Sequence, residues 1–129
     1  MTSPDSKATI LYVEDNPDNR LLLQAVLDGL HDIVEFESGP EALEGFAESA
    51  PDLVLLDISL PRMDGTEVLR RMRDDAALRD VPVIALTAHA MSGDRERFLE
   101  QGFDDYVSKP IVDETILIAA IDRLLPRDP

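Results

Sequence analysis

Residues 53–69 read LVLLDISLPRMDGTEVL, an apolar run that ends in one acid and is followed by a helix-start signal. The run Leu53 to Leu56 shows no polar alternation, which is typical of a strand buried on both faces of a parallel sheet. Asp64-Gly65-Thr66-Glu67 has the form of a capping box and opens a predicted helix with an apolar inner face of Val68, Leu69 and Met72. The stretch therefore predicts one strand, loop and helix unit of an α/β protein.

Similar units lie on both sides of that stretch. Short apolar runs predict four further strands, at Ala8 to Val13, Ile33 to Phe36, Val81 to Leu86 and Tyr106-Val107. The first predicted helix carries Leu22, Leu23, Val26, Leu27 and Leu30 on one face, and the second runs from Ser38-Gly39-Pro40-Glu41 to about Glu48. Ser92 and Gly102 bound the fourth, and Asp113 opens the last, with Leu117, Ala120, Ile121 and Leu124 at core spacing. Strands that alternate with helices predict a parallel sheet covered by helices on both faces.

The composition limits the class of protein. A chain of 129 residues with 44% hydrophobic residues suits one domain with an ordinary core, which we place at residues 8–125 between disordered tails at 1–7 and 126–129. The absence of cysteine excludes disulfides, thiolate metal sites and cysteine nucleophiles. No apolar run approaches the roughly 18 residues of a membrane span, and no apolar leader follows Met1, so we expect a cytoplasmic location.

The charge balance limits the partners. There are 12 basic and 27 acidic residues, and the resulting net charge of −15 disfavours binding to nucleic acid and to anionic membrane. Arg70, Arg71 and Arg73 form a small basic cluster on the predicted third helix, which we interpret as a solvated face.

Polar residues close the predicted strands. Glu14-Asp15 follows the first strand, Asp57 the third, Thr87 the fourth and Ser108-Lys109 the fifth. These residues should converge, because the carboxyl ends of parallel strands meet at one edge of the sheet. Acids packed together disfavour one another's ionisation unless a cation neutralises them, and Mg²⁺ prefers oxygen ligands. We therefore expect Mg²⁺ with Asp15 and Asp57 as direct ligands, whereas a zinc site is disfavoured without cysteine.

The same set of residues suits phosphoryl transfer. The Asp57 carboxylate can act as the nucleophile and become an aspartyl phosphate. Thr87 would then donate a hydrogen bond to one phosphoryl oxygen, and Lys109 would neutralise another. Pro110 makes a cis Lys109-Pro110 bond possible, which would aim the lysine inward.

Four motifs together resemble the receiver domain of the two-component response regulators. They are Leu11-Tyr12-Val13-Glu14-Asp15-Asn16, residues 55–65 from Leu55 to Gly65, Ala85-Leu86-Thr87-Ala88, and Tyr106-Val107-Ser108-Lys109-Pro110. The resemblance spans Ala8 to Leu125 and implies the flavodoxin-like strand order 2-1-3-4-5. It also implies that a histidine kinase or a histidine phosphotransfer protein phosphorylates Asp57, and that the cis form applies at Pro110. Mg²⁺ would be held by Asp15, Asp57 and the Ser59 carbonyl, with Glu14 orienting metal-bound water.

The resemblance further implies a switch. Thr87 would move toward the phosphoryl group and Tyr106 would turn inward, which would alter the face of the fourth helix, fifth strand and fifth helix. The side chains of Ser59 and His89 would tune how long the phosphoryl group survives. Only Pro126 to Pro129 follow the last helix, so we expect a stand-alone regulator whose output is contact with a downstream protein.

Three alternatives belong to other classes. A degenerate receiver would serve as a docking module without phosphorylation. A phosphatase of the haloacid dehalogenase type also uses a strand-end Asp and Mg²⁺, but it needs a second Asp where this chain has Ser59. A flavodoxin-type cofactor binder needs a phosphate loop, and Glu14-Asp15 would repel phosphate. We expect no enzyme beyond catalysis of the chain's own phosphorylation and dephosphorylation.

Overall fold

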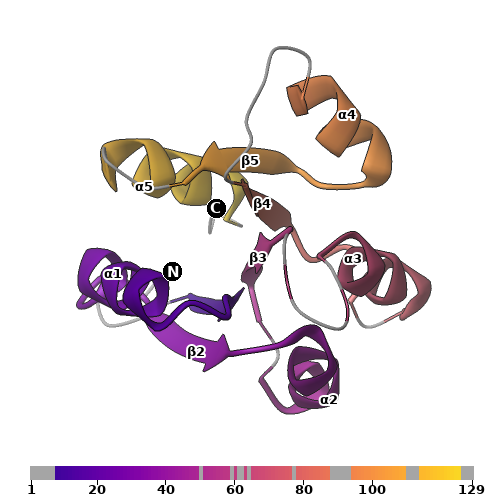
Figure 1. The fold of residues 1–129 in the computed structure, drawn as a ribbon, viewed down its shortest axis with the longest axis horizontal. Helices are drawn as coiled ribbons and strands as arrows, with labels where there is room; N and C mark the ends of the chain where they lie inside the picture. Colours follow the sequence, from indigo (N-terminus) through magenta and orange to yellow (C-terminus); the bar gives the residue numbers. More distant parts are fainter. Residues whose placement is uncertain are drawn as a thin grey trace, which may run out of the picture.

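Strands and helices alternate along the chain in the computed structural model, which describes residues 8–49, 51–58, 60, 63, 65–76, 78–87, 94–109 and 114–125 (Figure 1). Their bounds are β1 Thr9–Val13, α1 Pro17–Leu27, β2 Asp32–Phe36, α2 Gly39–Ser49, β3 Leu53–Asp57, α3 Gly65–Asp74, β4 Val83–Thr87, α4 Asp94–Gln101, β5 Asp105–Ser108 and α5 Glu114–Leu124. All neighbouring strands pair in parallel in the order β2-β1-β3-β4-β5. The predicted α/β fold and strand order are confirmed.

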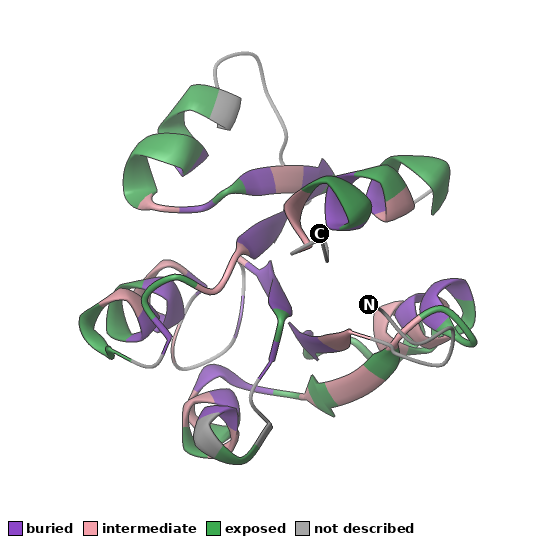
Figure 2. Cartoon of the chain, turned by 180° about the vertical axis from the view of Figure 1, so that it is seen from behind, coloured by how far each residue is buried: buried purple, intermediate pink, exposed green. Residues whose placement is uncertain are grey.

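Helices cover both faces of this sheet. α1 and α5 lie on one face, and α2, α3 and α4 lie on the other (Figure 1). Side chains of successive strand residues point to opposite faces of the sheet. Ile10 and Tyr12 of β1 therefore pack toward α1 and α5, whereas Leu11 and Val13 pack toward α2 and α3. β3 and β4 are buried along their whole length, as Figure 2 shows, which explains why their sequences lack polar alternation.

The strand ends place polar groups at one edge of the sheet. β3 and β4 each run one residue further than predicted and include a polar last residue, Asp57 and Thr87. β1 ends at Val13, so Glu14 follows it directly. Lys109 follows β5, and its N–H donates to the Thr87 carbonyl at 2.7 Å.

Local signals fix several helix ends. The Glu41 N–H donates to Ser38 Oγ at the start of α2, so the predicted cap there is confirmed. Gly102 ends α4 with a φ of 112°, a left-handed conformation that favours glycine. The N–H groups of Gly102 and Phe103 donate to the carbonyls of Leu99 and Phe98, the pattern of a Schellman cap. The predicted caps Asp64, Ser92 and Asp113 lie outside the described residues, as do the predicted tails.

Two sequence interpretations were wrong. Leu30 is 46% exposed rather than part of the core, because α1 ends at Leu27 and Gly29, with a φ of 80°, turns the chain away. Arg73 is not part of a solvated face. Its guanidinium donates to the carbonyls of Arg79, Val81 and Gly102, so it connects α3 to the start of β4 and to the turn after α4.

The described helices contain no segment that combines the length and apolar character needed to cross a bilayer.

Candidate functional site

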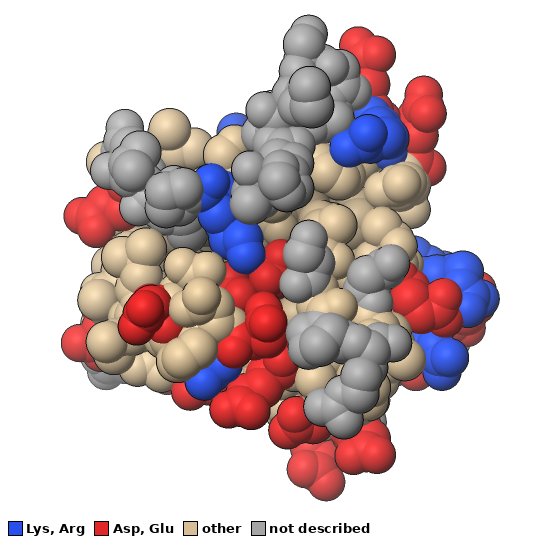
Figure 3. Space-filling model, in the orientation of Figure 1, with Lys and Arg blue, Asp and Glu red and all other residues tan. Residues whose placement is uncertain are grey.

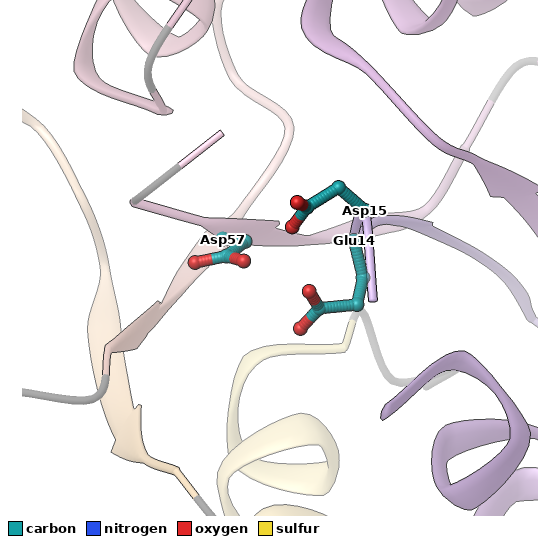
Figure 4. A group of neighbouring side chains, drawn as sticks. All are labelled: Glu14, Asp15 and Asp57. Atoms are coloured by element: carbon teal, nitrogen blue, oxygen red, sulfur yellow. The ribbon is translucent and has the colours of Figure 1, made fainter. Parts of the chain in front are cut away.

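Three carboxylates meet at the carboxyl edge of the sheet. Glu14 and Asp15 follow β1, and Asp57 ends the neighbouring strand β3, with Val13 opposite Leu56 in the register. One oxygen from each acid lies within 4.8 Å of the others, and Figure 4 shows the three side chains around a common space. Glu14 and Asp57 are buried, whereas Asp15 is exposed. The structure thus brings together the acids that the sequence singled out.

Lys109 joins this cluster from the other side. Its Nζ donates to Asp57 Oδ2 at 2.9 Å and to Glu14 Oε1 at 3.1 Å, and its side chain is 14% exposed. Acidic side chains gather over the middle of this face of the molecule, beside a basic group (Figure 3). One ammonium group therefore bridges two buried carboxylates, and the described cluster of three acids and one lysine keeps an excess of negative charge.

The protonation of the cluster reflects this excess. Burial, together with the hydrogen bond and the negative charge of Asp57, raises the pKa of Glu14 to about 7. Burial opposes the charged form of Lys109, but its hydrogen bond to Asp57 and the charges of Asp57 and Glu14 outweigh burial and raise its pKa. The lysine therefore stays charged. Binding of a proton or another cation beside Glu14 is favoured, because it offsets the negative charge that Lys109 leaves uncompensated.

Thr87 and Tyr106 lie on the adjoining strands. Thr87 is buried at the end of β4, directly after Leu86, which pairs with Asp57. Tyr106 of β5 is half-buried, and its ring centroid lies 5.7 Å from that of Phe98 on α4. Ser59, His89 and Pro110, the other predicted site residues, lie outside the described residues.

A known family accounts for this arrangement. Its description, "Response regulator receiver domain", matches residues 10–122 of the chain. The chain belongs to this family. It is therefore a receiver domain of the response regulators of two-component signalling.

Relatives of this receiver domain agree with the assignment. The chain is 43% identical over 104 residues to the polar-differentiation response regulator DivK of Brucella ovis. The aligned residues cover 80% of this chain and 85% of that protein. DivK of Brucella anthropi is 42% identical over the same shares.

Solved structures are also similar. A putative response regulator from Chloroflexus aurantiacus has a TM-score of 0.87 at 28% identity, with 95% of this chain and 100% of that chain covered. The receiver domain of the sensor histidine kinase PA1611 from Pseudomonas aeruginosa, which has a magnesium ion coordinated in its active site cleft, has a TM-score of 0.82 at 36% identity. That comparison covers 92% of this receiver domain and 98% of the other.

Sequence reasoning missed three residues that hold the acids. The Asn16 N–H and Asn19 Nδ2 donate to the Glu14 carboxylate at 3.2 and 3.3 Å. The Arg20 guanidinium donates to the carbonyls of Glu14 and Asp15. One signal was present, because a cation in the first turn of a helix opposes the helix dipole and so indicates a specific partner.

The donor set of this receiver domain fits a hard divalent cation. Mg²⁺ binds oxygen ligands at about 2.0–2.1 Å and takes one or two carboxylates with water for the rest. Three carboxylate oxygens within 4.8 Å of one another supply such ligands. A nearby cation would also favour the charged form of Glu14, whose pKa is raised by burial and by Asp57. Asp15, the exposed member, offers its oxygens on the open side.

Proposed function

We propose that this receiver domain accepts a phosphoryl group on Asp57 in a reaction that depends on Mg²⁺. The observation that carries the proposal is the position of the Asp57 carboxylate, which lies among Glu14, Asp15 and Lys109 at one edge of the sheet. Phosphoryl transfer needs cations around the moving group, since its oxygens carry spread negative charge. Asp57 supplies the nucleophile and Lys109 a fixed positive charge beside it.

The donor would be a phosphohistidine of a histidine kinase or of a histidine phosphotransfer protein. An Asp57 oxygen attacks phosphorus, and the bond between phosphorus and the donor nitrogen breaks. The electron pair stays on the imidazole nitrogen, which takes up a proton from water, and Asp57 becomes an acyl phosphate. Lys109 would exchange its contact with the carboxylate for one with a phosphoryl oxygen, and the Thr87 hydroxyl would donate to another.

Asp15 and Asp57 would hold the Mg²⁺, together with the carbonyl of Ser59. When bound, the ion would neutralise charge on the phosphoryl oxygens during transfer. Glu14 is buried and bound to Lys109, Asn16 and Asn19. This suits a role in orienting metal-bound water rather than in coordinating the ion directly. We propose that the chain catalyses only its own phosphorylation and dephosphorylation, and that Ser59 and His89 tune the lifetime of the phosphoryl group.

The deciding experiment is intact-mass analysis after incubation with acetyl phosphate and Mg²⁺. The native chain should gain the mass of one phosphoryl group, and Asp57→Asn should gain none. Asp52→Asn is the matched control, because Asp52 precedes the same strand at its opposite end, where it binds the Thr9 N–H. An adduct on Asp57→Asn would place the acceptor elsewhere. Absence of an adduct from every variant would favour the docking module, and turnover of phosphate monoesters would favour the phosphatase.

We further propose that the downstream partner binds the face of α4, β5 and α5. Among the described residues of α4, Phe98 is buried, whereas its neighbour Leu99 is 42% exposed. Ile116 of α5 is 58% exposed. Because Tyr106 packs on Phe98, a change at the tyrosine would reach α4 directly. Equal hydrogen-exchange protection of α4 with and without phosphorylation would remove the support for this switch.

A further inference from the structure

Arg20 binds three successive carbonyl groups of the segment that carries the acids. Its Nη1 donates to the carbonyl oxygens of Glu14 and Asp15 at 2.9 and 3.1 Å. Its backbone N–H donates to the carbonyl of Asn16 at 3.0 Å. One residue in the first turn of α1 therefore fixes the whole connection between β1 and that helix.

The arginine is itself held in place. Its Nη2 donates to Glu37 Oε1 at 3.3 Å, and its own carbonyl oxygen lies 3.2 Å from the hydroxyl oxygen of Tyr12. The side chain is only 15% exposed. Contacts from β1 and from the residue after β2 thus limit its motion, so its two bonds to the carbonyls of Glu14 and Asp15 have a defined geometry.

The two acids of this segment depend on the backbone to different degrees. The Glu14 carboxylate is held by Lys109, Asn16 and Asn19. Within the described part of the chain, the Asp15 carboxylate has no hydrogen bond or ion pair of its own. Its position follows from the backbone of the segment, and Arg20 fixes that backbone.

We propose that Arg20 is a positioning residue for the cation site: by binding the carbonyls of Glu14 and Asp15 it holds the Asp15 carboxylate opposite Asp57. The proposal rests on the proposed function, since it assigns Asp15 to the Mg²⁺ that phosphoryl transfer needs. Arg20 does not touch the ion or the phosphoryl group and acts through the backbone alone.

Because Arg20 is positively charged, a charge effect and a positioning effect would change the Mg²⁺ affinity of a neutral variant in opposite directions. A positive guanidinium near the cluster repels Mg²⁺, so if charge were its whole effect, a neutral variant would bind Mg²⁺ more tightly. Loss of positioning has the opposite effect, because changes in residues that orient metal ligands typically weaken metal binding about 10–100-fold. The expected result for Arg20→Gln is therefore a dissociation constant for Mg²⁺ raised by roughly tenfold or more.

The test is calorimetric titration with MgCl₂, accompanied by thermal unfolding of each variant. Arg73→Gln is the matched control, because Arg73 also donates from one Nη1 to two carbonyls, those of Arg79 and Val81, but at the opposite end of the sheet. Both glutamine variants should lose stability, and only Arg20→Gln should lose Mg²⁺ affinity. Arg20→Lys keeps a donor for the carbonyls, so its affinity should lie between those of the native chain and Arg20→Gln.

Each outcome decides the matter. Equal or tighter Mg²⁺ binding by Arg20→Gln would overturn the positioning role while leaving the proposed function intact. Equal weakening by Arg73→Gln would overturn it as well, since the loss would then follow stability alone. If Arg20→Gln does not fold, Arg20→Lys decides alone, and native affinity with reduced stability would overturn the role. A native chain that binds no Mg²⁺ would overturn both proposals.

Discussion

Replacing Gly65 by alanine should disturb the end of the strand that carries Asp57. A Cβ at Gly65 would lie 2.3 Å from the Asp57 carbonyl oxygen and 2.9 Å from the Ile58 Cα. Both atoms are backbone, and the Gly65 N–H already donates to the Ile58 carbonyl at 2.9 Å. The start of α3 or the end of β3 must therefore move, because no side chain can rotate away.

The size of that movement determines how much stability and how much of the phosphorylation rate the variant should lose. Ordinary contact for a Cβ begins at 3.4 Å, so the approach of 2.3 Å is too close by 3.4 − 2.3 = 1.1 Å. Overpacking that forces the backbone to shift costs about 1–3 kcal/mol of stability. A misplacement of about 1 Å at a reacting group can cost roughly 100-fold in rate. Gly65→Ala should lose both stability and most of its rate of phosphorylation at Asp57.

Gly29→Ala is the matched control for the chemistry of the substitution. Gly29 has a φ of 80°, and among the described residues no atom beyond its two chain neighbours lies within 4 Å of the position that a Cβ would take, so alanine there meets only backbone strain of about 1–2 kcal/mol. It should lose comparable stability but keep the native phosphorylation rate. The two variants thus separate a close approach at the site from a general loss of stability.

Urea unfolding followed by circular dichroism gives the stability, and the rate of mass gain with acetyl phosphate gives the chemistry. A Gly65→Ala chain that unfolds at the native urea concentration would show that the close approach is absent. Equal slowing of phosphorylation in both alanine variants would show that Gly65 has no particular link to Asp57.

Three further predictions concern other parts of the molecule. Tyr12→Phe should cost about 1–2 kcal/mol at neutral pH, because the Tyr12 hydroxyl donates to the Glu35 carboxylate and lowers its pKa. The lowered pKa of Glu35 contributes stability that is present above its unfolded value, 4.5, and is lost as pH falls through the folded value. The difference in stability between the native chain and Tyr12→Phe should therefore shrink in acid. A difference in melting temperature that stays constant over several pH values would contradict this. Without metal, Asp57→Asn should raise the melting temperature by a few degrees, since it removes one of three carboxylates whose repulsion Lys109 only partly offsets. It should also shrink the gain that Mg²⁺ gives in scanning calorimetry, and an undiminished gain would exclude Asp57 as a ligand. Phe98→Ala should cost roughly 3 kcal/mol, whereas Leu99→Ala, on the same helix but 42% exposed, should cost far less; similar urea midpoints would mean that Phe98 does not anchor α4.

The fold was predictable because several local signals agreed. The uninterrupted apolar runs around Leu55 and Ile84 indicated buried parallel strands, and both strands are buried throughout. The Ser38 and Gly102 signals marked real helix ends. Leu30 was misjudged because helical periodicity continues past Leu27 in the sequence, whereas the chain turns at Gly29.

The acids and the lysine of the site were predictable for a topological reason. Parallel strands bring their carboxyl ends together whatever lies between them in the chain, so Asp57 and Lys109 meet across 52 positions. The partners of Arg20 and Arg73 were not predictable, because both bind backbone carbonyls, which every residue possesses. The place of Arg20 in the first turn of a helix indicated that it has a partner, but not which one. The cross-strand pair Tyr12 and Glu35 required the register of β1 and β2, which composition does not set.

The binding of Arg73 has a mechanical consequence for α4. Its Nη2 donates to the Gly102 carbonyl at 2.8 Å, and the next residue, Phe103, is buried against Phe98. The carboxyl terminus of α4 is therefore tethered to α3. If α4 is displaced, it therefore rotates about Gly102. The displacement is smallest at that turn and increases along the helix toward Asp94.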